Sequence, residues 1–282
     1  MTTQTSSTFL ALLEGCWRKQ NFVCVGLDPE YSRIPAIVKQ ADAVDESIFR
    51  FNRGIIDATH DLVCAYKPNS AFYEALGESG LRALRKTIHY IKEHYLHIPV
   101  ILDAKRADIG NTNQGYVSAI FDYLDADAVT VHPYLGREAL LPFLERKDKG
   151  ILVLVKTSNA GSDELQNLPV GAAQEPLYQV VARQVARDWN THGNCALVVG
   201  ATYPAELRQI RAIAGDVPIL IPGVGAQGGD VAATVQAGKD SRGWGMIISS
   251  SRGIIFASSE DNFALAARQA TIQLRDMILT AL

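Results

Sequence analysis

The sequence predicts an α/β protein, a (β/α)8 TIM barrel that forms a single domain over residues 1–282. Eight short apolar segments recur along the chain, longer segments with helical spacing separate them, and polar or turn-forming residues follow the short segments. Strands that alternate with helices indicate βαβ units, and eight such units make up a closed barrel. An open, doubly wound sheet is the alternative fold, because a sequence does not show whether a sheet closes.

The residues before the first strand, 1–20, are expected to be an N-terminal extension with a short amphipathic helix. The helix begins near Phe9, with Ser7 or Thr8 as its N-cap. The extension lacks the features of a secretory signal or a transit peptide, and no run of about 18 apolar residues occurs in the chain. We therefore expect a cytoplasmic protein without a membrane span.

The predicted strands are rich in β-branched residues and are apolar at almost every position. This continuous apolarity is typical of strands buried on both faces of a parallel sheet. We expect strands at residues 22–27, 62–66, 100–102, 128–131, 151–155, 196–199, 219–221 and 246–248. Helical spacing predicts helices between them, for example over 177–189 and 205–213.

The longest segment without a regular pattern spans residues 157–174, between the fifth strand and the next helix. Most connections in a compact domain are much shorter. A loop of this length is often functional, so we regard this segment as a candidate lid.

The composition excludes several classes of protein. The chain has 27 Lys and Arg against 30 Asp and Glu, a net charge of −3, so it lacks the basic excess of a nucleic-acid binder. The hydrophobic share of 48% and charged share of 20% are those of an ordinary globular protein. No pair of its four cysteines has the spacing of a zinc or redox motif, and no HExxH pattern occurs, so we expect reduced, buried thiols and no metal site.

Polar residues gather where the predicted strands end, which is where the active site of a barrel lies. They are Asp28, Lys67, Asp103, Lys105, Asp108, Ser158, Gly223 and Arg252. Within this set, Asp103 and Lys105 lie two residues apart on a strand, so their side chains share one face. Together with Asp108 and Lys67 they could form a charged array that holds a lysine ready to donate a proton. The alternative is a structural ion pair at the mouth of the barrel.

A glycine-rich segment, residues 221–230, follows the seventh strand, and the sequence SSSRG follows the eighth. Phosphate sites in barrels often use these two loops, because small residues let backbone amides approach an anion. Arg252 would add a forked cation for phosphate oxygens. The alternative for Arg252 is an exposed arginine at the start of a helix.

The chain resembles the orotidine 5′-phosphate decarboxylase family, and the resemblance covers nearly its whole length. The matching motifs, in the family's order, are GLDP at 26–29, YKPN at 66–69, DAKRADIGNT at 103–112, VKTSNAGS at 155–162 and PGVGAQGGD at 222–230. The chain length and the segment AYKPNSAFYEALG are similar to the longer bacterial subfamily. Ala107 stands where family members often have glycine, and this difference leaves every charge in place.

The resemblance implies a homodimer that converts orotidine 5′-monophosphate to uridine 5′-monophosphate, the last step of de novo pyrimidine synthesis, without a metal ion or organic cofactor. It implies that Lys105 donates the proton and that Lys67, Asp103 and Asp108 complete the array. Asp108 and Thr112 would reach into the neighbouring subunit's site. By the same resemblance, Asp28 and Lys67 would contact the ribose, Ser158 the pyrimidine ring, and Gln227 and Arg252 the phosphate.

Two other functions stay open at this point. The chain is also similar to 3-keto-L-gulonate 6-phosphate decarboxylase, a magnesium enzyme with a DxKxxD barrel and an acidic residue at the second strand end, where this chain has Lys67. The other alternative is a barrel without catalysis that binds a phosphorylated ligand and senses nucleotides.

Overall fold

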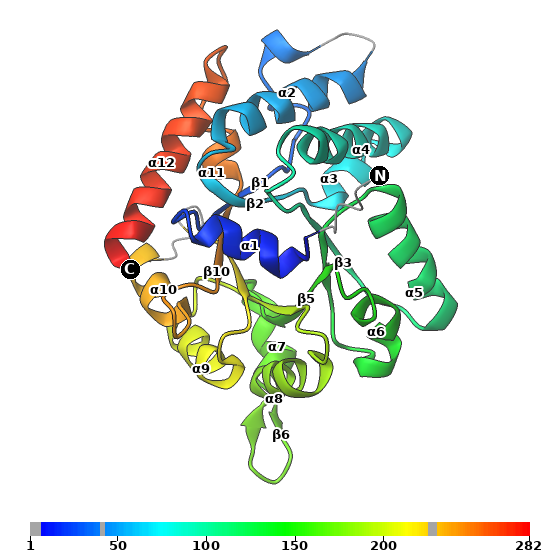
Figure 1. Ribbon diagram of the computed structural model, residues 1–282, viewed down its shortest axis with the longest axis vertical. Coiled ribbons are helices and arrows are strands. Elements are labelled where there is room, and N and C mark those ends of the chain that lie inside the picture. Colours follow the sequence, from blue (N-terminus) through cyan, green and yellow to red (C-terminus); the bar gives the residue numbers. More distant parts are fainter. Residues whose placement is uncertain (1–6, 40–42, 225–229) are drawn as a thin grey trace.

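Eight parallel strands form a barrel at the centre of the molecule, as the computed structural model shows for residues 7–39, 43–224 and 230–282 (Figure 1). The strands are β1 (Val23–Gly26), β2 (Val63–Lys67), β3 (Ile101–Arg106), β4 (Ala128–Val131), β5 (Gly150–Lys156), β8 (Cys195–Val199), β9 (Ile219–Pro222) and β10 (Met246–Ser250). They pair in the order β2-β1-β10-β9-β8-β5-β4-β3. All eight predicted strands are therefore confirmed, with ends that differ by a few residues.

The sheet closes between β2 and β3, so the predicted barrel is confirmed and the open sheet is excluded. Two isolated parallel bridges join these strands, Tyr66 with Val100 and Asn69 with Asp103. The amide of Asp103 donates to the carbonyl of Pro68 at 2.9 Å, just above the end of β2. This seam matters for the site, because Asp103 lies on it.

Helices surround the barrel and follow the strands in turn (Figure 1). The main ones are α2 (Val44–Thr59), α4 (Gly77–His94), α5 (Gly110–Val117), α6 (Gly136–Leu144), α8 (Leu177–Gln184), α9 (Pro204–Ala214), α10 (Val231–Gly238) and α12 (Phe263–Ala281). Shorter helices are α3 (Ser70–Glu74), α7 (Asp163–Gln166) and α11 (Arg252–Ile255). Further helical turns lie at Ala36–Val38, Ala160–Ser162, Ser118–Tyr123 and Val185–Trp189, the last two continuing α5 and α8.

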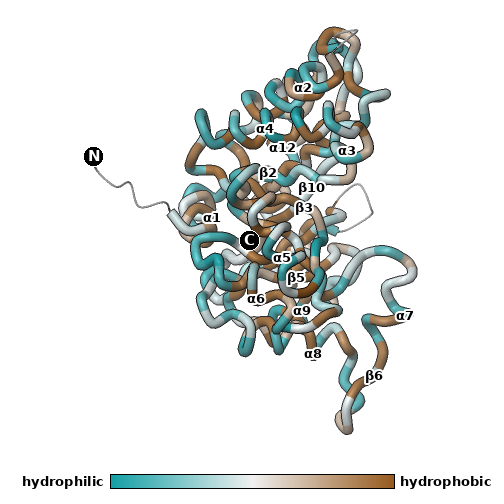
Figure 2. Tube along the Cα trace, turned by 90° about the vertical axis from the view of Figure 1, so that its right-hand side faces the viewer, coloured by the Kyte–Doolittle hydropathy of each residue, from teal (hydrophilic) through white to brown (hydrophobic). Residues whose placement is uncertain are grey.

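Helix α1 (Phe9–Trp17) covers the amino-terminal end of the barrel. The Thr8 hydroxyl accepts a hydrogen bond from the amide of Ala11, so the predicted N-cap is confirmed at Thr8. The indole of Trp17 donates to the carbonyl of Met246 at 2.9 Å, where β10 begins. Figure 2 shows α1 on the opposite side of the molecule from α7, so the carboxyl ends of the strands are left open for a site.

The core consists of the strands and the inner faces of the helices. Every residue of β1, β2, β4, β8 and β10 is buried, as their continuous apolarity predicts. All four cysteines are free and buried, and burial raises the pKa of the Cys24 thiol to about 12, so this thiol is unreactive at neutral pH. No helix in residues 7–39, 43–224 and 230–282 is long and apolar enough to cross a membrane.

The segment from 157 to 176 differs from the irregular loop that the sequence predicts. It contains the turn Ala160–Ser162, helix α7 and a small antiparallel hairpin of β6 (Pro169–Val170) and β7 (Glu175–Pro176). These elements are too short to show a periodic apolar pattern, which explains why the sequence did not predict them. The hairpin projects from the barrel (Figures 1 and 2).

Candidate active site

The carboxylate of Asp103 is the centre of the site, and four hydrogen-bond donors surround it. Its Oδ1 accepts from Lys105 Nζ at 2.7 Å and from the Thr130 hydroxyl at 2.8 Å. Its Oδ2 accepts from Lys67 Nζ at 3.0 Å and from the Asn69 side-chain amide at 3.4 Å. The donors come from β2, the turn after it, β3 and β4, so three neighbouring strands fix the position of one carboxylate.

Strand β3 is irregular where it carries Asp103 and Lys105. Its register with β4 shifts between Leu102 and Arg106, and Lys105 has a φ of 47°, a value that residues other than glycine rarely adopt. The Thr130 hydroxyl accepts the amide hydrogen of Lys105 at 2.9 Å and so holds this backbone in place. Strain of this kind persists only where surrounding contacts enforce it, and it is common at functional sites.

The charges of the array stabilise one another. Burial alone would raise the pKa of Asp103, but Lys67 and Lys105 outweigh burial and hold this pKa well below its ordinary value. Burial alone would lower the pKa of Lys67, but Asp103 and Asp28 outweigh it and hold this pKa above its ordinary value. Lys67 is buried, whereas the side chain of Lys105 is 49% exposed. A carboxylate and a buried ammonium are therefore both kept charged, next to an ammonium that a ligand can reach.

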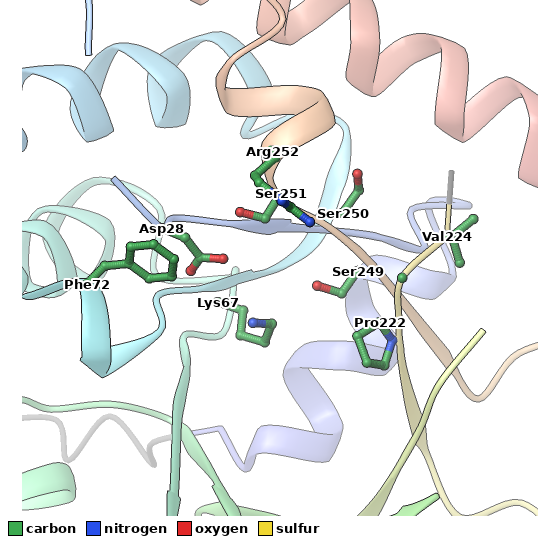
Figure 3. Close-up of a pocket in the computed structure, with 10 residues that line it drawn as sticks. Asp28, Lys67, Phe72, Pro222, Val224, Ser249, Ser250, Ser251 and Arg252 are labelled. Atoms are coloured by element: carbon green, nitrogen blue, oxygen red, sulfur yellow. The ribbon is translucent and has the colours of Figure 1, made fainter. Parts of the chain in front are cut away.

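A cavity of about 270 Å³ lies on one side of Lys67 (Figure 3). Figure 3 shows Asp28, Lys67 and Phe72 around the same space as the serines that end β10. Its lining consists of Asp28, Lys67, Phe72, Pro222, Gly223, Val224, Ser249, Ser250, Ser251 and Arg252. Hydroxyl groups and the exposed guanidinium of Arg252 thus gather at this end, which suits an anionic group.

A second cavity, of about 490 Å³, shares Lys67 and Pro222 with the first. Its polar wall contains Asp103, Lys105, Thr130, Thr157, Ser158, Asn159 and Gln166, and its apolar wall contains Leu154, Val198 and Leu220. Apolar walls with a few polar groups suit a flat, partly polar ring. The two cavities therefore adjoin at Lys67 and Pro222, and Asp103 and Lys105 line the larger one.

Two glycines allow parts of the site to approach each other closely. A Cβ on Gly26 would lie 2.6 Å from the Cβ of Ser251, and a Cβ on Gly200 would lie 2.8 Å from the Cβ of Ser158. Both gaps are too short for a side chain. Gly26 therefore permits β1 to pack against Ser251, which precedes Arg252 and helix α11, and Gly200 permits the end of β8 to pack against the loop that carries Ser158.

The structure brings most of the predicted site residues together, but not all of them. Asp28, Lys67, Asp103, Lys105, Ser158 and Arg252 line the two cavities. Asp108 and Thr112 lie outside them, at the rim, where the Asp108 carboxylate accepts the amide hydrogen of Ile109 and Thr112 is exposed on α5. Gln227 falls outside the described residues.

Three polar residues of the site region were not singled out from the sequence. Thr130 and Asn69 both donate to Asp103, and Lys156 is a buried charge at the end of β5. Thr130 is a polar residue inside the apolar strand AVTV, and this break in the pattern was a usable signal. The roles of Asn69 and Lys156 depend on contacts that no local pattern displays.

Comparison with known proteins gives a consistent result. Residues 21–267 match the family model described as orotidine 5′-phosphate decarboxylase / HUMPS family. A protein of Cellvibrio japonicus named orotidine 5′-phosphate decarboxylase is 50% identical over 97% of this chain and 99% of its own. The structure of Leishmania donovani OMP decarboxylase superimposes with a TM-score of 0.82 at 36% identity, over 96% of this chain and 99% of that one. The longer Leishmania donovani UMP synthase superimposes with a TM-score of 0.86 at 39% identity, over 98% of this chain and 56% of that one.

The ionisation of Asp103 gives a direct test of the array. We expect the wild-type carboxylate to stay ionised well below its unfolded pKa of about 3.9, because Lys67 and Lys105 stabilise its charge. The ionised Asp103 carboxylate then adds to the free energy of unfolding at every pH above ~4. This contribution is lost as the pH falls through the lower pKa that Asp103 has in the folded protein. Carbon-detected NMR of the carboxyl carbon would follow this titration.

Two variants separate the contributions of the lysines. Lys67→Met should raise the pKa of Asp103 more than Lys105→Met does, because Lys67 is buried and solvent screens the half-exposed Lys105. A wild-type carboxylate that titrates near pH 4, or a larger rise in Lys105→Met, would contradict this account.

Proposed function

This chain belongs to the orotidine 5′-phosphate decarboxylase / HUMPS family, and we propose that it is the carboxy-lyase that converts orotidine 5′-monophosphate to uridine 5′-monophosphate and carbon dioxide. The proposal includes a reaction without a metal ion, with Lys105 as the proton donor, in a cytoplasmic homodimer. The observation that carries it is the Asp103 carboxylate of the larger cavity, held between the ammonium groups of Lys105 and of Lys67, which lines both cavities.

The shape of the site supports a nucleoside monophosphate as substrate. The phosphate would bind at the end with Arg252 and the β10 serines, and the ring would lie against Leu154 and Leu220 beside Ser158. The ribose would then lie next to Asp28 and Lys67, between the two ends. By the resemblance, Gln227, which lies outside the described residues, would also contact the phosphate.

The chemistry needs a group that stabilises negative charge at C6 of the ring. When the bond between C6 and the carboxylate breaks, carbon dioxide leaves and the electron pair stays on C6. The Lys105 ammonium would stabilise this pair and then transfer a proton to it, and the half-exposed amine would regain a proton from water. The array is fixed before the substrate binds, so we attribute the rate enhancement to preorganised electrostatics.

Asp103 would lie near the departing carboxylate. Two like charges about 4 Å apart at an effective dielectric constant of about 20 repel by roughly 4 kcal/mol. Loss of carbon dioxide relieves this repulsion, whereas the attraction between Lys105 and C6 grows as charge develops. The second effect acts in the transition state and is the one we assign to catalysis.

Independence from metal ions is supported by the occupancy of the carboxylate oxygens. Each oxygen of Asp103 already accepts two hydrogen bonds, and by the resemblance Lys67 stands where the magnesium-dependent family has an acidic residue. A divalent cation beside Lys67 would be repelled.

An absorbance assay with orotidine 5′-monophosphate and excess EDTA tests the proposal. We expect full turnover by the wild type, and we expect Lys105→Ala to lose far more than tenfold in kcat, because the proton donor is gone. Lys147→Ala, which truncates an exposed lysine near the other end of the barrel, is the matched control.

Three outcomes would count against parts of the proposal. Activity that needs magnesium would favour the sugar-phosphate enzyme, and binding of uridine 5′-monophosphate without turnover would favour a sensor. A Lys105→Ala variant that keeps more than about a tenth of the wild-type kcat, a loss under roughly 1.4 kcal/mol, would remove Lys105 from the donor role.

Arg252→Ala should weaken turnover of orotidine 5′-monophosphate much more than turnover of orotidine, the nucleoside without phosphate. Arg252 is exposed at the phosphate end, far along the site from Lys105, so a substrate without that group has no contact to lose. Steady-state kinetics on both substrates measure this difference. Equal fractional losses in kcat/KM would show that Arg252 does not serve the phosphate.

The homodimer explains the rim positions of Asp108 and Thr112, which would complete the site of the partner subunit. Apolar side chains are exposed close by in the chain after β3 and β4, at Ile109, Tyr134 and Leu135. Exposed apolar groups at a rim are typical of an interface. Mixing inactive Lys105→Ala with inactive Asp108→Asn tests the arrangement.

If Asp108 acts in the partner's site, each mixed dimer has one intact site and one site with both defects. Random exchange makes about half of the dimers mixed, so about a quarter of wild-type activity should return. If Asp108 serves its own subunit, every site keeps one defect. No recovery, with exchange confirmed by native mass spectrometry, would exclude the shared site and leave the decarboxylase proposal intact.

A further inference from the structure

Lys156 is a charged residue inside the fold, apart from the array around Asp103. It ends β5, and its side chain has no exposed surface. Its ammonium donates to Ser162 Oγ at 3.1 Å, Asp163 Oδ1 at 2.6 Å and Asn167 Oδ1 at 3.1 Å. The rings of Tyr203 and Tyr178 lie 4.8 and 6.0 Å from the nitrogen. Three oxygens and two aromatic faces therefore satisfy a charge that would otherwise be costly to bury.

All three oxygen partners of this ammonium belong to the segment 157–176. Ser162 ends the short turn, Asp163 begins α7, and Asn167 follows α7. Most residues of the segment are exposed and the others, apart from Ser162, are half-buried, and the segment projects from the barrel (Figure 2). The end of β5 thus contacts the segment at three residues through one ammonium group. The segment itself has little buried apolar surface that could hold it in place.

The same segment supplies one wall of the larger cavity. Thr157, Ser158, Asn159 and Gln166 line that cavity, whereas Lys156 does not. Gln166 accepts the amide hydrogen of Thr157 at 2.9 Å and donates to its hydroxyl at 2.8 Å, so α7 and the start of the segment are joined. The position of α7 therefore sets the position of this wall, and Lys156 sets the position of α7.

We propose that Lys156 is a positioning residue: its ammonium holds the segment 157–176 folded so that Ser158 and Gln166 form the wall against the substrate ring. The assignment of that wall to the ring depends on the proposed function. A buried ion pair seldom adds net stability, because desolvation offsets the attraction. Asp163 is 59% exposed, so this pair is a weak source of stability, and its contacts are better explained by the geometry they impose.

The test compares Lys156→Met, which keeps the length and apolar stem of the side chain, with the control Lys147→Met. We expect Lys156→Met to weaken binding of uridine 5′-monophosphate and to lower kcat/KM by about tenfold, the effect of losing one well-placed set of contacts. Inhibition by ribose 5-phosphate should stay within about twofold, since this ligand reaches only the phosphate and ribose end. A variant with a general folding defect would bind uridine 5′-monophosphate and ribose 5-phosphate more weakly by the same factor.

Hydrogen exchange supplies a readout that does not depend on the substrate. Amides of residues 157–176 should exchange about tenfold faster in Lys156→Met, while those of the barrel strands stay protected. If Lys156→Met does not fold, Asp163→Asn takes its place in this experiment. It changes an exposed side chain and keeps a hydrogen-bond acceptor, so amide exchange in residues 157–176 should become faster by a smaller factor. Unchanged exchange in the segment, or equal losses for both ligands, would overturn the proposal.

These readouts separate the inference from the proposed function. A wild type that binds uridine 5′-monophosphate without decarboxylating orotidine 5′-monophosphate would overturn the proposed reaction, yet the exchange and binding comparisons would still decide the role of Lys156. Conversely, a fully active Lys156→Met variant with native exchange would remove the positioning role and leave the reaction unaffected.

Discussion

The Asp103 carboxylate and its four donors are the interaction on which the rest of the site depends. The donors come from β2, β3 and β4, and the β2–β3 seam closes the barrel through the bridge between Asn69 and Asp103. Closure of the sheet and assembly of the charged array are therefore one event. Removal of the Asp103 carboxylate from the closed barrel would leave Lys67 buried without its ion-pair partner, a loss that typically costs about 3–5 kcal/mol.

This arrangement also explains why β3 is irregular. A regular strand would already place Asp103 and Lys105 on one face, but here Lys105 Nζ also comes within 2.7 Å of Asp103 Oδ1. The register shift and the positive φ at Lys105 bring this about, and the Thr130 hydroxyl stabilises the result from the neighbouring strand. Local strain is accepted at one residue because the surrounding hydrogen bonds outweigh it.

Two buried lysines at strand ends have different tasks in this molecule. Lys67 pairs with a carboxylate from the neighbouring strand, so its charge belongs to the reaction centre that we propose for this family member. Lys156 pairs with oxygens of the segment that directly follows it, so its charge shapes a wall of the cavity. The type of residue and its place at a strand end are the same, and only the partners distinguish the two roles.

The sequence by itself determined the α/β class, the eight strands and several of the charged and polar residues that line the cavities, because burial on both faces produces continuous apolar runs and charged residues stand out where such runs end. It also identified Asp103 and Lys105 as neighbours, since spacing along one strand is a local property. Only the tertiary structure decided the closure of the sheet, the contacts of Thr130 and Asn69 with Asp103, the partners of Lys156 and the rim position of Asp108. Those contacts join residues on different strands and loops, and their distances depend on register and closure, which no local pattern of residues encodes.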